Sequence, residues 1–208
     1  MLKLGLTGGI ASGKSAVGEM FVKGGAHLIQ SDAVGHALMQ AGQAVYEEVV
    51  RRFGREILNP DGTINRSRLA EAAFGTPGGS PPRVQELNEI VHPSVIDHEN
   101  QWMEEISRRD PNAIAIVEAA LILEAKAAGR FDRLIVVTCR PEQRILRYAR
   151  RLGISEEAAR AEVTRRMAAQ IPDEEKIKAA DFVIDNSGSL ESTEEQVQRV
   201  FVALQNLR

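Results

Sequence analysis

Residues 8–15 read Gly-Gly-Ile-Ala-Ser-Gly-Lys-Ser, which is a Gly-x4-Gly-Lys-Ser pattern. Glycines in such a loop let successive backbone N–H groups turn inward around phosphate oxygens, and a helix that follows presents its positive end to the same anion. An apolar run at residues 2–6 precedes the loop, and apolar residues at helical spacing over 17–21 follow it. The order strand, loop, helix is the context in which this pattern binds phosphate.

Lys14 and Ser15 follow the last glycine of the loop, and both residue types have a defined use there. The lysine reaches the outer phosphates, and the serine hydroxyl is a ligand for Mg²⁺. The chain lacks the Asn-Lys-x-Asp segment with which GTPases read guanine, so kinases and ATPases remain. The predicted nucleotide-binding residues on this segment are Gly9, Ala11, Ser12, Gly13, Lys14, Ser15 and Ala16.

Four more short apolar runs predict the other strands of a parallel sheet, at Ala26–Ile29, Ala113–Val117, Leu134–Val137 and Phe182–Ile184. Helical patterns separate these runs, so we expect a three-layer α/β/α core with a five-stranded parallel sheet. The gap between the second and third runs is too long for a simple crossover and carries turn signals at 59–62 and 76–82.

We therefore predict a single kinase unit with two additions. Its core would comprise residues 1–32, 110–139 and 171–208. An inserted helical substrate domain would occupy about residues 33–109, and a helical lid would occupy about residues 140–170.

Composition limits the class of protein further. Across 208 residues, 43% are hydrophobic, 26% are charged and 4% are aromatic, and the net charge is −3, which disfavours disorder and a surface that binds nucleic acid throughout. Cys139 is the single cysteine, so no internal disulfide forms and a reducing compartment is expected. We find no export signal and no apolar run that could cross a membrane, and we expect a cytoplasmic protein.

Three acidic residues are candidates for catalysis or metal binding. Asp32 follows the second predicted strand, where it could deprotonate an acceptor hydroxyl, although it could equally cap a helix that begins at Ala33. Glu118 ends the third strand and could orient Mg²⁺ through water, or be a loop carboxylate without a ligand. Glu124 is a weaker candidate for metal binding. The alternative is that it is an exposed helix residue without a ligand.

A basic segment covers residues 140–166, which contain eight arginines, no lysine and four acids. Arg140, Arg144, Arg147 and Arg151 lie at spacings of 4, 3 and 4, which places them along one face of a helix. Arginine suits bidentate phosphate binding, so we interpret the segment as a lid over ATP. A solvated helix face and an RNA-binding surface are the alternatives, but Tyr148 is the only aromatic residue in residues 140–166 that could stack on a base.

Several motifs resemble those of dephospho-CoA kinases, in order and over nearly the whole chain. The loop begins Leu-Thr-Gly-Gly-Ile at residue 6, and Ser-Asp-Ala at 31–33 resembles the acid-bearing turn of that family. Further similarity is carried by Phe53-Gly54, Ile57-Leu58, Asp61-Gly62, Arg66-x-x-Leu69, Leu87-Asn88-x-x-Val91-His92-Pro93 and the segment from Ala180 to Ser189.

The resemblance implies transfer of the ATP γ-phosphoryl group to the ribose 3′-hydroxyl of dephospho-CoA, which completes coenzyme A. It implies that Asp32 is the general base and binds substrate, and that Arg147 and Arg151 belong to the lid and contact ATP. The expected catalytic residues are therefore Lys14, Asp32 and Arg147. The resemblance also places Asn186 near the adenine of ATP and His92 on the acceptor side. The residues alone leave an alternative for His92, in which the His92-Pro93 pair breaks a helix.

The expected partners are ATP and dephospho-CoA with Mg²⁺, no nucleic acid and no membrane, and a monomer is favoured. Three positions depart from the family pattern. Gln30 stands where an additional Asp is frequent, Ala16 where Thr is common, and Ala120 where Pro is usual. A kinase for another small alcohol or nucleoside monophosphate, and a non-catalytic ATP-binding switch, are the remaining alternatives.

Overall fold

The structure is a computed structural model that describes residues 1–75 and 81–207. The chain forms two compact units, one made of Met1–Ile29 with Met103–Arg208 and the other of Gln30–Trp102. The first turn signal is confirmed, since Gly62 N donates to Asn59 O at 3.0 Å. Of the second, at 76–82, residues 76–80 lie outside the described part of the chain.

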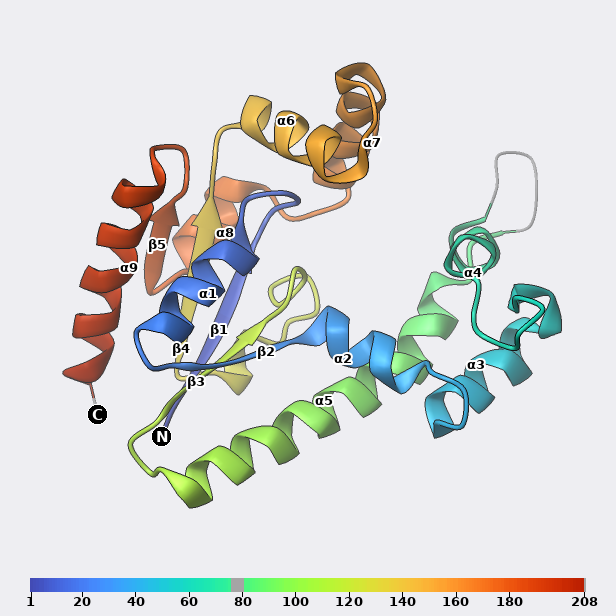
Figure 1. Cartoon of the computed structure of the whole chain (residues 1–208), viewed down its shortest axis with the longest axis horizontal. Coiled ribbons are helices and arrows are strands. Elements are labelled where there is room, and N and C mark those ends of the chain that lie inside the picture. Colours follow the sequence, from blue (N-terminus) through green and yellow to red (C-terminus); the bar gives the residue numbers. More distant parts are fainter. Residues whose placement is uncertain (76–80, 208) are drawn as a thin grey trace. The chain divides into compact units, whose positions relative to one another are not determined.

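Five parallel strands form the sheet of the first unit, in the order β2-β3-β1-β4-β5 (Figure 1). All five follow the apolar runs expected from the sequence, with shifts of one or two residues at their ends. Their bounds are β1 Leu2–Gly8, β2 His27–Gln30, β3 Ile114–Glu118, β4 Arg133–Thr138 and β5 Phe182–Asp185.

The central strand β1 pairs with β3 through Leu6 and Glu118, and with β4 through Gly8 and Val137. These pairings bring the carboxyl ends of the strands to the same edge of the sheet. In open parallel sheets this edge is where ligands bind.

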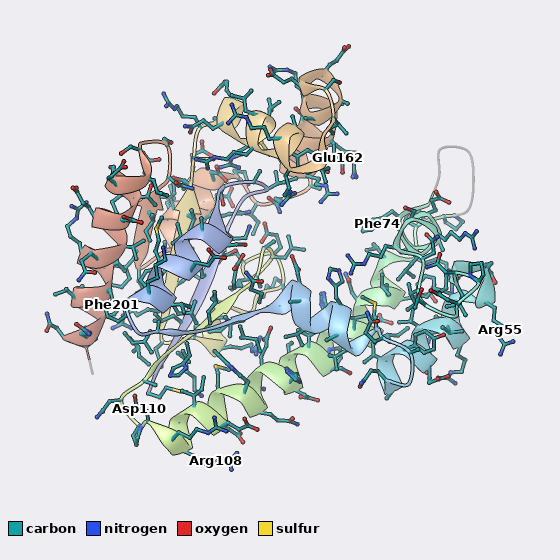
Figure 2. All side chains as sticks on the ribbon, viewed as in Figure 1. Arg55, Phe74, Arg108, Asp110, Glu162 and Phe201 are labelled. Atoms are coloured by element: carbon teal, nitrogen blue, oxygen red, sulfur yellow. The ribbon has the colours of Figure 1, made fainter. Side chains whose placement is uncertain are left out.

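The residues of β4 alternate between two hydrophobic clusters, as strand geometry requires. Ile135 and Val137 belong to the larger cluster, to which α1 (Lys14–Lys23) and α9 (Leu190–Gln205) also contribute. Phe201 of α9, labelled in Figure 2, is one of its buried members. Leu134 and Val136 pack instead with Ile122 and the short segment that precedes β4. Helices and turns therefore cover both faces of the sheet.

Between β4 and β5 the first unit carries a helical segment, and Figure 1 shows its first two helices side by side. Its elements are α6 Pro141–Leu152, α7 Glu156–Ala168 and the shorter α8 Asp173–Ala179. The 3₁₀ turn Ala128–Arg130 precedes β4.

The second unit is helical. It contains α2 Ser31–Leu38, α3 Ala44–Phe53, the 3₁₀ turn Arg55–Ile57, α4 Arg66–Phe74 and the N-terminal part of α5 Val84–Arg109. Val45, Val49, Phe53, Ile57, Leu69 and Ala73 form its buried core. The alternative that His92-Pro93 breaks a helix is wrong, because α5 continues through Pro93.

Within the two described stretches, none of the helices combines the length and the apolar character that crossing a bilayer requires.

Candidate functional site

The loop between β1 and α1 wraps tightly, and its shape depends on glycine at Gly13. This residue has a φ of 96°, in the left-handed region, and a Cβ atom there would overlap the amide of Asn186. Inside the loop, Ser12 N donates to Gly9 O at 3.2 Å, and Ala11 has a φ of 52°. The backbone therefore curls as expected of a phosphate-binding loop that leads into a helix N-terminus.

Lys14 and Ser15 begin α1 and place a cation and a hydroxyl at the loop. The Lys14 ammonium group donates to Gly8 O at 3.2 Å and to Gly9 O at 3.4 Å, so it lies over the loop. The Ser15 hydroxyl donates to Glu118 Oε1 at 2.7 Å. Because β1 and β3 are neighbours, Glu118 reaches the helix start from the end of its strand.

Ala16 follows Ser15 on α1 and has an exposed side chain. Near the same edge of the sheet, the Thr7 hydroxyl donates to Ala120 O at 3.2 Å. The chain therefore has a defined turn after β3 although proline is missing at position 120.

An ion pair between a buried arginine and a partly exposed aspartate lies beneath the loop. Arg144 of α6 is 1% exposed and pairs with Asp173, the first residue of α8. Its guanidinium also donates twice to Cys139 O, at 3.3 Å in both cases. A Cβ atom at Gly9 would overlap this guanidinium, so Arg144 packs directly against the loop.

Asn186, just after β5, also holds the loop. Its amide donates to Ser12 O at 2.9 Å, and its side-chain oxygen accepts from Thr193 Oγ1 at 3.0 Å. Arg147 of α6 joins the two segments, since it donates to Ser12 O at 3.1 Å and to Asn186 O at 2.8 Å. The structure thus brings Arg147 and Asn186 together with the loop.

The pair α6 and α7 covers one loop residue with an apolar cluster. Ile10 packs with Ile145, Tyr148, Ala149, Ala159 and Val163. The Arg151 guanidinium lies over the Tyr148 ring, 5.3 Å from its centroid. On α7, hydrogen bonds from Arg165 and then Arg166 lower the pKa of Glu162 to about 2.

These contacts change the interpretation of the arginine stripe. Arg140 precedes α6 as its N-cap, and Arg144 is buried. Arg147 bonds to Ser12 O in the loop and to Asn186 O, so the middle of the stripe is not the solvated face that was one alternative, whereas Arg140 and Arg151 at its ends are exposed. An RNA-binding surface loses support for the same reason, because Arg144 and Arg147 are directed toward the protein's own groups.

Asp32 and His92 lie in the second unit, where they line one hollow of about 220 Å³. Asp32 is exposed in the first turn of α2; the N-cap of that helix is Gln30, so the helix-cap alternative for Asp32 is wrong. The preceding residue, Ser31, donates to Glu99 Oε1 at 2.6 Å, and Glu99 is 2% exposed. This bond fixes the start of α2 and with it the backbone position of Asp32.

The exposed-helix interpretation of Glu124 is wrong. The residue lies in a turn, not on an exposed helix, and its carboxylate pairs with the buried Lys176 ammonium at 2.9 Å. It also accepts from Ile171 N at 3.1 Å. Glu124 therefore ties the turn after β3 to the segment around α8.

Sequence reasoning missed Asp173, Thr193 and the buried position of Arg144. No pattern around Asp173 distinguishes it from the two acids that follow it in α8. Thr193 lies about one helical turn after Ser189, near the start of α9, and this spacing could have drawn attention to it. That its hydroxyl bonds to Asn186 could be found only from the fold.

The parallel sheet, the loop and the lysine and serine at the start of α1 define a P-loop kinase fold. Comparison with known proteins then identifies the family. The family model described as dephospho-CoA kinase matches residues 2–192. The chain belongs to the dephospho-CoA kinase family, whose members are ATP-dependent kinases of the last step in coenzyme A biosynthesis.

Individual relatives agree with this. The chain is 36% identical to the dephospho-CoA kinase of Corynebacterium efficiens and 38% identical to that of Aquifex aeolicus, in each case over 98% of both chains. A crystal structure from Thermus thermophilus superposes with a TM-score of 0.76 at 32% identity, covering 98% of this chain and 97% of that one. The dephospho-CoA kinase from Campylobacter jejuni shares the fold, with a TM-score of 0.60 at 24% identity, covering 97% and 96% of the two chains.

Proposed function

We propose that this chain transfers the γ-phosphoryl group of ATP to the 3′-hydroxyl of dephospho-CoA, giving coenzyme A and ADP. The observation that carries the proposal is the loop around Gly13, with Lys14 above it and Ser15 bonded to Glu118. Such a loop holds the donor through its backbone N–H groups, and Lys14 neutralises charge on the outer phosphates. Catalysis then rests on positioning and on charge stabilisation, which are the main requirements of phosphoryl transfer.

The residues at the end of β3 and the start of α1 fit Mg²⁺. Ser15 and Glu118 present a hydroxyl and a carboxylate 2.7 Å apart, and oxygen donors are the ligands that this ion prefers. Ser15 would be the direct ligand, and Glu118 would orient the ion through water. When bound, the ion offsets charge on the β- and γ-phosphates.

On the acceptor side, Asp32 is proposed to take the proton of the 3′-hydroxyl. As the ribose oxygen forms its bond to the γ-phosphorus, the bond from that phosphorus to the bridging oxygen breaks and ADP leaves. The exposed position of Asp32 in a hollow supports this role, because a base must reach its substrate. His92 lines the same hollow and is proposed to shape the acceptor site.

The segment about 140–170 is proposed as a lid whose Arg147 and Arg151 contact ATP, and Asn186 is proposed to lie near the adenine. The segment about 33–109 would receive the acceptor. We also propose a cytoplasmic, monomeric enzyme.

The test is ADP release in a coupled assay with dephospho-CoA, adenosine and shikimate as separate acceptors. We expect turnover with dephospho-CoA to exceed that with the others by at least about 10³-fold, since the acceptor site must recognise more than one hydroxyl. ADP release independent of dephospho-CoA would refute the proposal. Asp32→Asn should lower kcat by about 10²- to 10⁴-fold and leave ATP affinity within a few-fold; unchanged turnover would refute the role of Asp32 as base.

A further inference from the structure

The helical unit buries a carboxylate at Glu99 of α5. The side chain is 2% exposed, and among the described residues from 30 to 102 no other charged side chain is buried. Val91, Val95 and Glu99 are spaced by four residues, so they share one face of the helix. A carboxylate in this apolar stripe costs more to bury than an aliphatic side chain, and its presence points to a use beyond packing.

The same face of α5 packs against α2, which runs in the opposite direction. A Cβ atom at Gly35 of α2 would lie 3.7 Å from both Val91 and Val95. One turn earlier on α2, Ser31 Oγ donates to Glu99 Oε1 at 2.6 Å, a length typical of a bond between a hydroxyl and a carboxylate. Glu99 is therefore bonded to the first turn of α2, the turn that also carries the proposed base.

This bond also decides what the Ser31 hydroxyl presents to the acceptor site. Ser31 and Asp32 both line the hollow of about 220 Å³, whereas Glu99 is not among its described lining residues. A hydroxyl has one hydrogen and two lone pairs, and Glu99 accepts the hydrogen. Without that acceptor, Ser31 could donate to neighbouring groups, the Asp32 carboxylate among them, and occupy an oxygen that the acceptor hydroxyl needs.

We propose that Glu99 is a positioning residue for phosphoryl transfer and acts through Ser31. It holds the helical turn that bears Asp32, and it keeps the Ser31 hydrogen directed away from that carboxylate. The acceptor hydroxyl then meets Asp32 in one defined orientation, which is a condition for efficient proton removal. This inference rests on the proposed function, in which Asp32 takes the proton.

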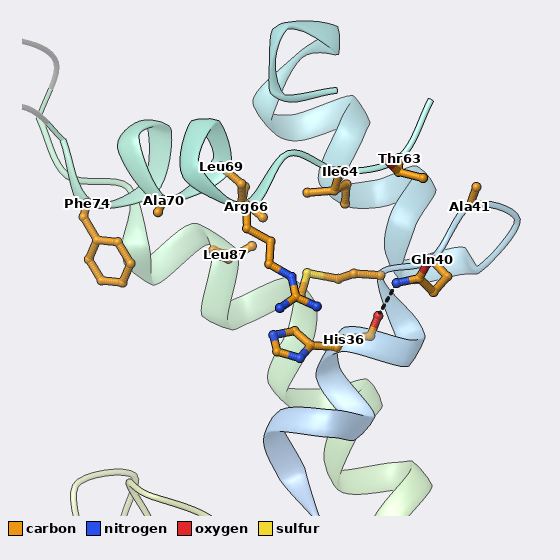
Figure 3. Close-up of a pocket in the computed structure, with 11 residues that line it drawn as sticks. His36, Gln40, Ala41, Thr63, Ile64, Arg66, Leu69, Ala70, Phe74 and Leu87 are labelled. Carbon is orange, nitrogen blue, oxygen red and sulfur yellow. Dashed lines mark hydrogen bonds between the residues drawn. The ribbon is translucent and has the colours of Figure 1, made fainter. Parts of the chain in front are cut away.

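The other end of α2 provides a matched control. There Gln40 Nε2 donates to His36 O at 3.1 Å, the bond drawn as a dashed line in Figure 3. This bond lies at a separate hollow of about 200 Å³, whose described lining includes neither Ser31 nor Asp32. Gln40→Ala therefore removes a hydrogen bond to the same helix and leaves the bond from Ser31 to Glu99 in place.

The test measures the rate of the chemical step by rapid quench in single turnovers, because product release limits kcat in many enzymes. Ser31→Ala and Glu99→Gln should each lower this rate by about 10-fold, since a small misplacement of a catalytic group is enough for such a loss. Gln40→Ala, and Glu89→Gln at an exposed acid of α5, should stay within about 2-fold of the wild type.

Binding separates positioning from a general loss of structure. Titration calorimetry should give Kd values for ATP and for dephospho-CoA within about 3-fold of the wild type in all four variants, because a positioning role acts on the rate. Far-UV circular dichroism should show the same helix content. A rate loss in Ser31→Ala and Glu99→Gln that is matched by an equal weakening of dephospho-CoA binding would overturn the inference.

The double variant with Ser31→Ala and Glu99→Gln shows whether Glu99 acts through Ser31. Its rate should equal that of Ser31→Ala alone, because residues that act as one unit do not have additive effects. A double variant whose loss is the product of the two single losses would overturn the inference. Wild-type rates in both single variants would do the same.

The two proposals fail in different ways. If wild-type protein does not phosphorylate dephospho-CoA, the proposed function is wrong. If it does, and Ser31→Ala and Glu99→Gln behave like the two control variants, only the role of Glu99 is wrong.

Discussion

The ion pair beneath the loop has two unequal partners, and this inequality yields a prediction about stability. Arg144 is 1% exposed and Asp173 is 29% exposed. Removing Asp173 leaves a buried cation whose remaining acceptor, among the described residues, is Cys139 O. Removing Arg144 leaves a carboxylate that water already reaches.

The magnitudes follow from that difference. Removing one member of a buried ion pair costs about 3–5 kcal/mol when the other stays uncompensated, so we expect about 3–4 kcal/mol for Asp173→Ala. Arg144→Met keeps most of the aliphatic volume and lets the carboxylate hydrate, so we expect about 1–2 kcal/mol. The double variant should resemble Arg144→Met alone, because it contains no buried charge.

Urea unfolding followed by far-UV circular dichroism measures these differences. Glu174→Ala is the matched control, since Glu174 is the exposed acid next to Asp173 in the first turn of α8, and it should change the free energy of unfolding by about 0.5 kcal/mol. Two results would refute the role assigned to burial. One is an equal loss of unfolding free energy in Asp173→Ala and Arg144→Met, and the other is a loss in the double variant that equals the sum of the two single losses. ATP affinity should fall in both single variants, because Gly9 packs against the guanidinium, which Arg144→Met removes and Asp173→Ala leaves without its carboxylate.

Two further predictions concern the loop and the helical unit. Asn186→Ala should lower the free energy of unfolding by about 1–3 kcal/mol and weaken ATP binding, since it removes the buried amide that donates to Ser12 O; calorimetry with ATP and urea unfolding would show both losses, and a variant with wild-type values would contradict the proposed anchoring. Hydrogen bonds from Arg83 and then Arg52 lower the pKa of Glu86 from 4.5 to about 2, so its contribution to stability is present above pH 4.5 and is lost as the pH falls toward 2. In Glu86→Gln the free energy of unfolding should therefore fall less than in the wild type between pH 4.5 and pH 2. The same pH dependence in both proteins would show that Glu86 does not contribute.

The core of the fold could be predicted because the responsible interactions are local. Each buried parallel strand is a short continuous apolar run, and the loop at residues 8–15 carries its own geometry in its glycines and in the helix that follows. The spacing of the arginines also located Arg147, whereas Asn186 was found only through the family resemblance.

The errors fall on side chains whose role depends on distant partners. Glu124 was expected to be a possible metal ligand or an exposed residue, and Lys176, which pairs with it, is 52 positions later in the chain. Arg144 belonged to a regular stripe that gave no sign of burial against Gly9. A helix break at Pro93 was one alternative for the His92-Pro93 pair, yet α5 continues through it, since tertiary packing can outweigh the local cost of proline.

The most direct test of the central claim is the position of the transferred phosphate. Purified protein, Mg²⁺, ATP and dephospho-CoA are incubated, and the product is analysed by ³¹P NMR and mass spectrometry, with Lys14→Ala as the inactive control. The account predicts a product that is heavier by one phosphoryl group and has a new monoester at the ribose 3′ position, and none with Lys14→Ala. A phosphate at another position, or ADP formed without a phosphorylated acceptor, would contradict it.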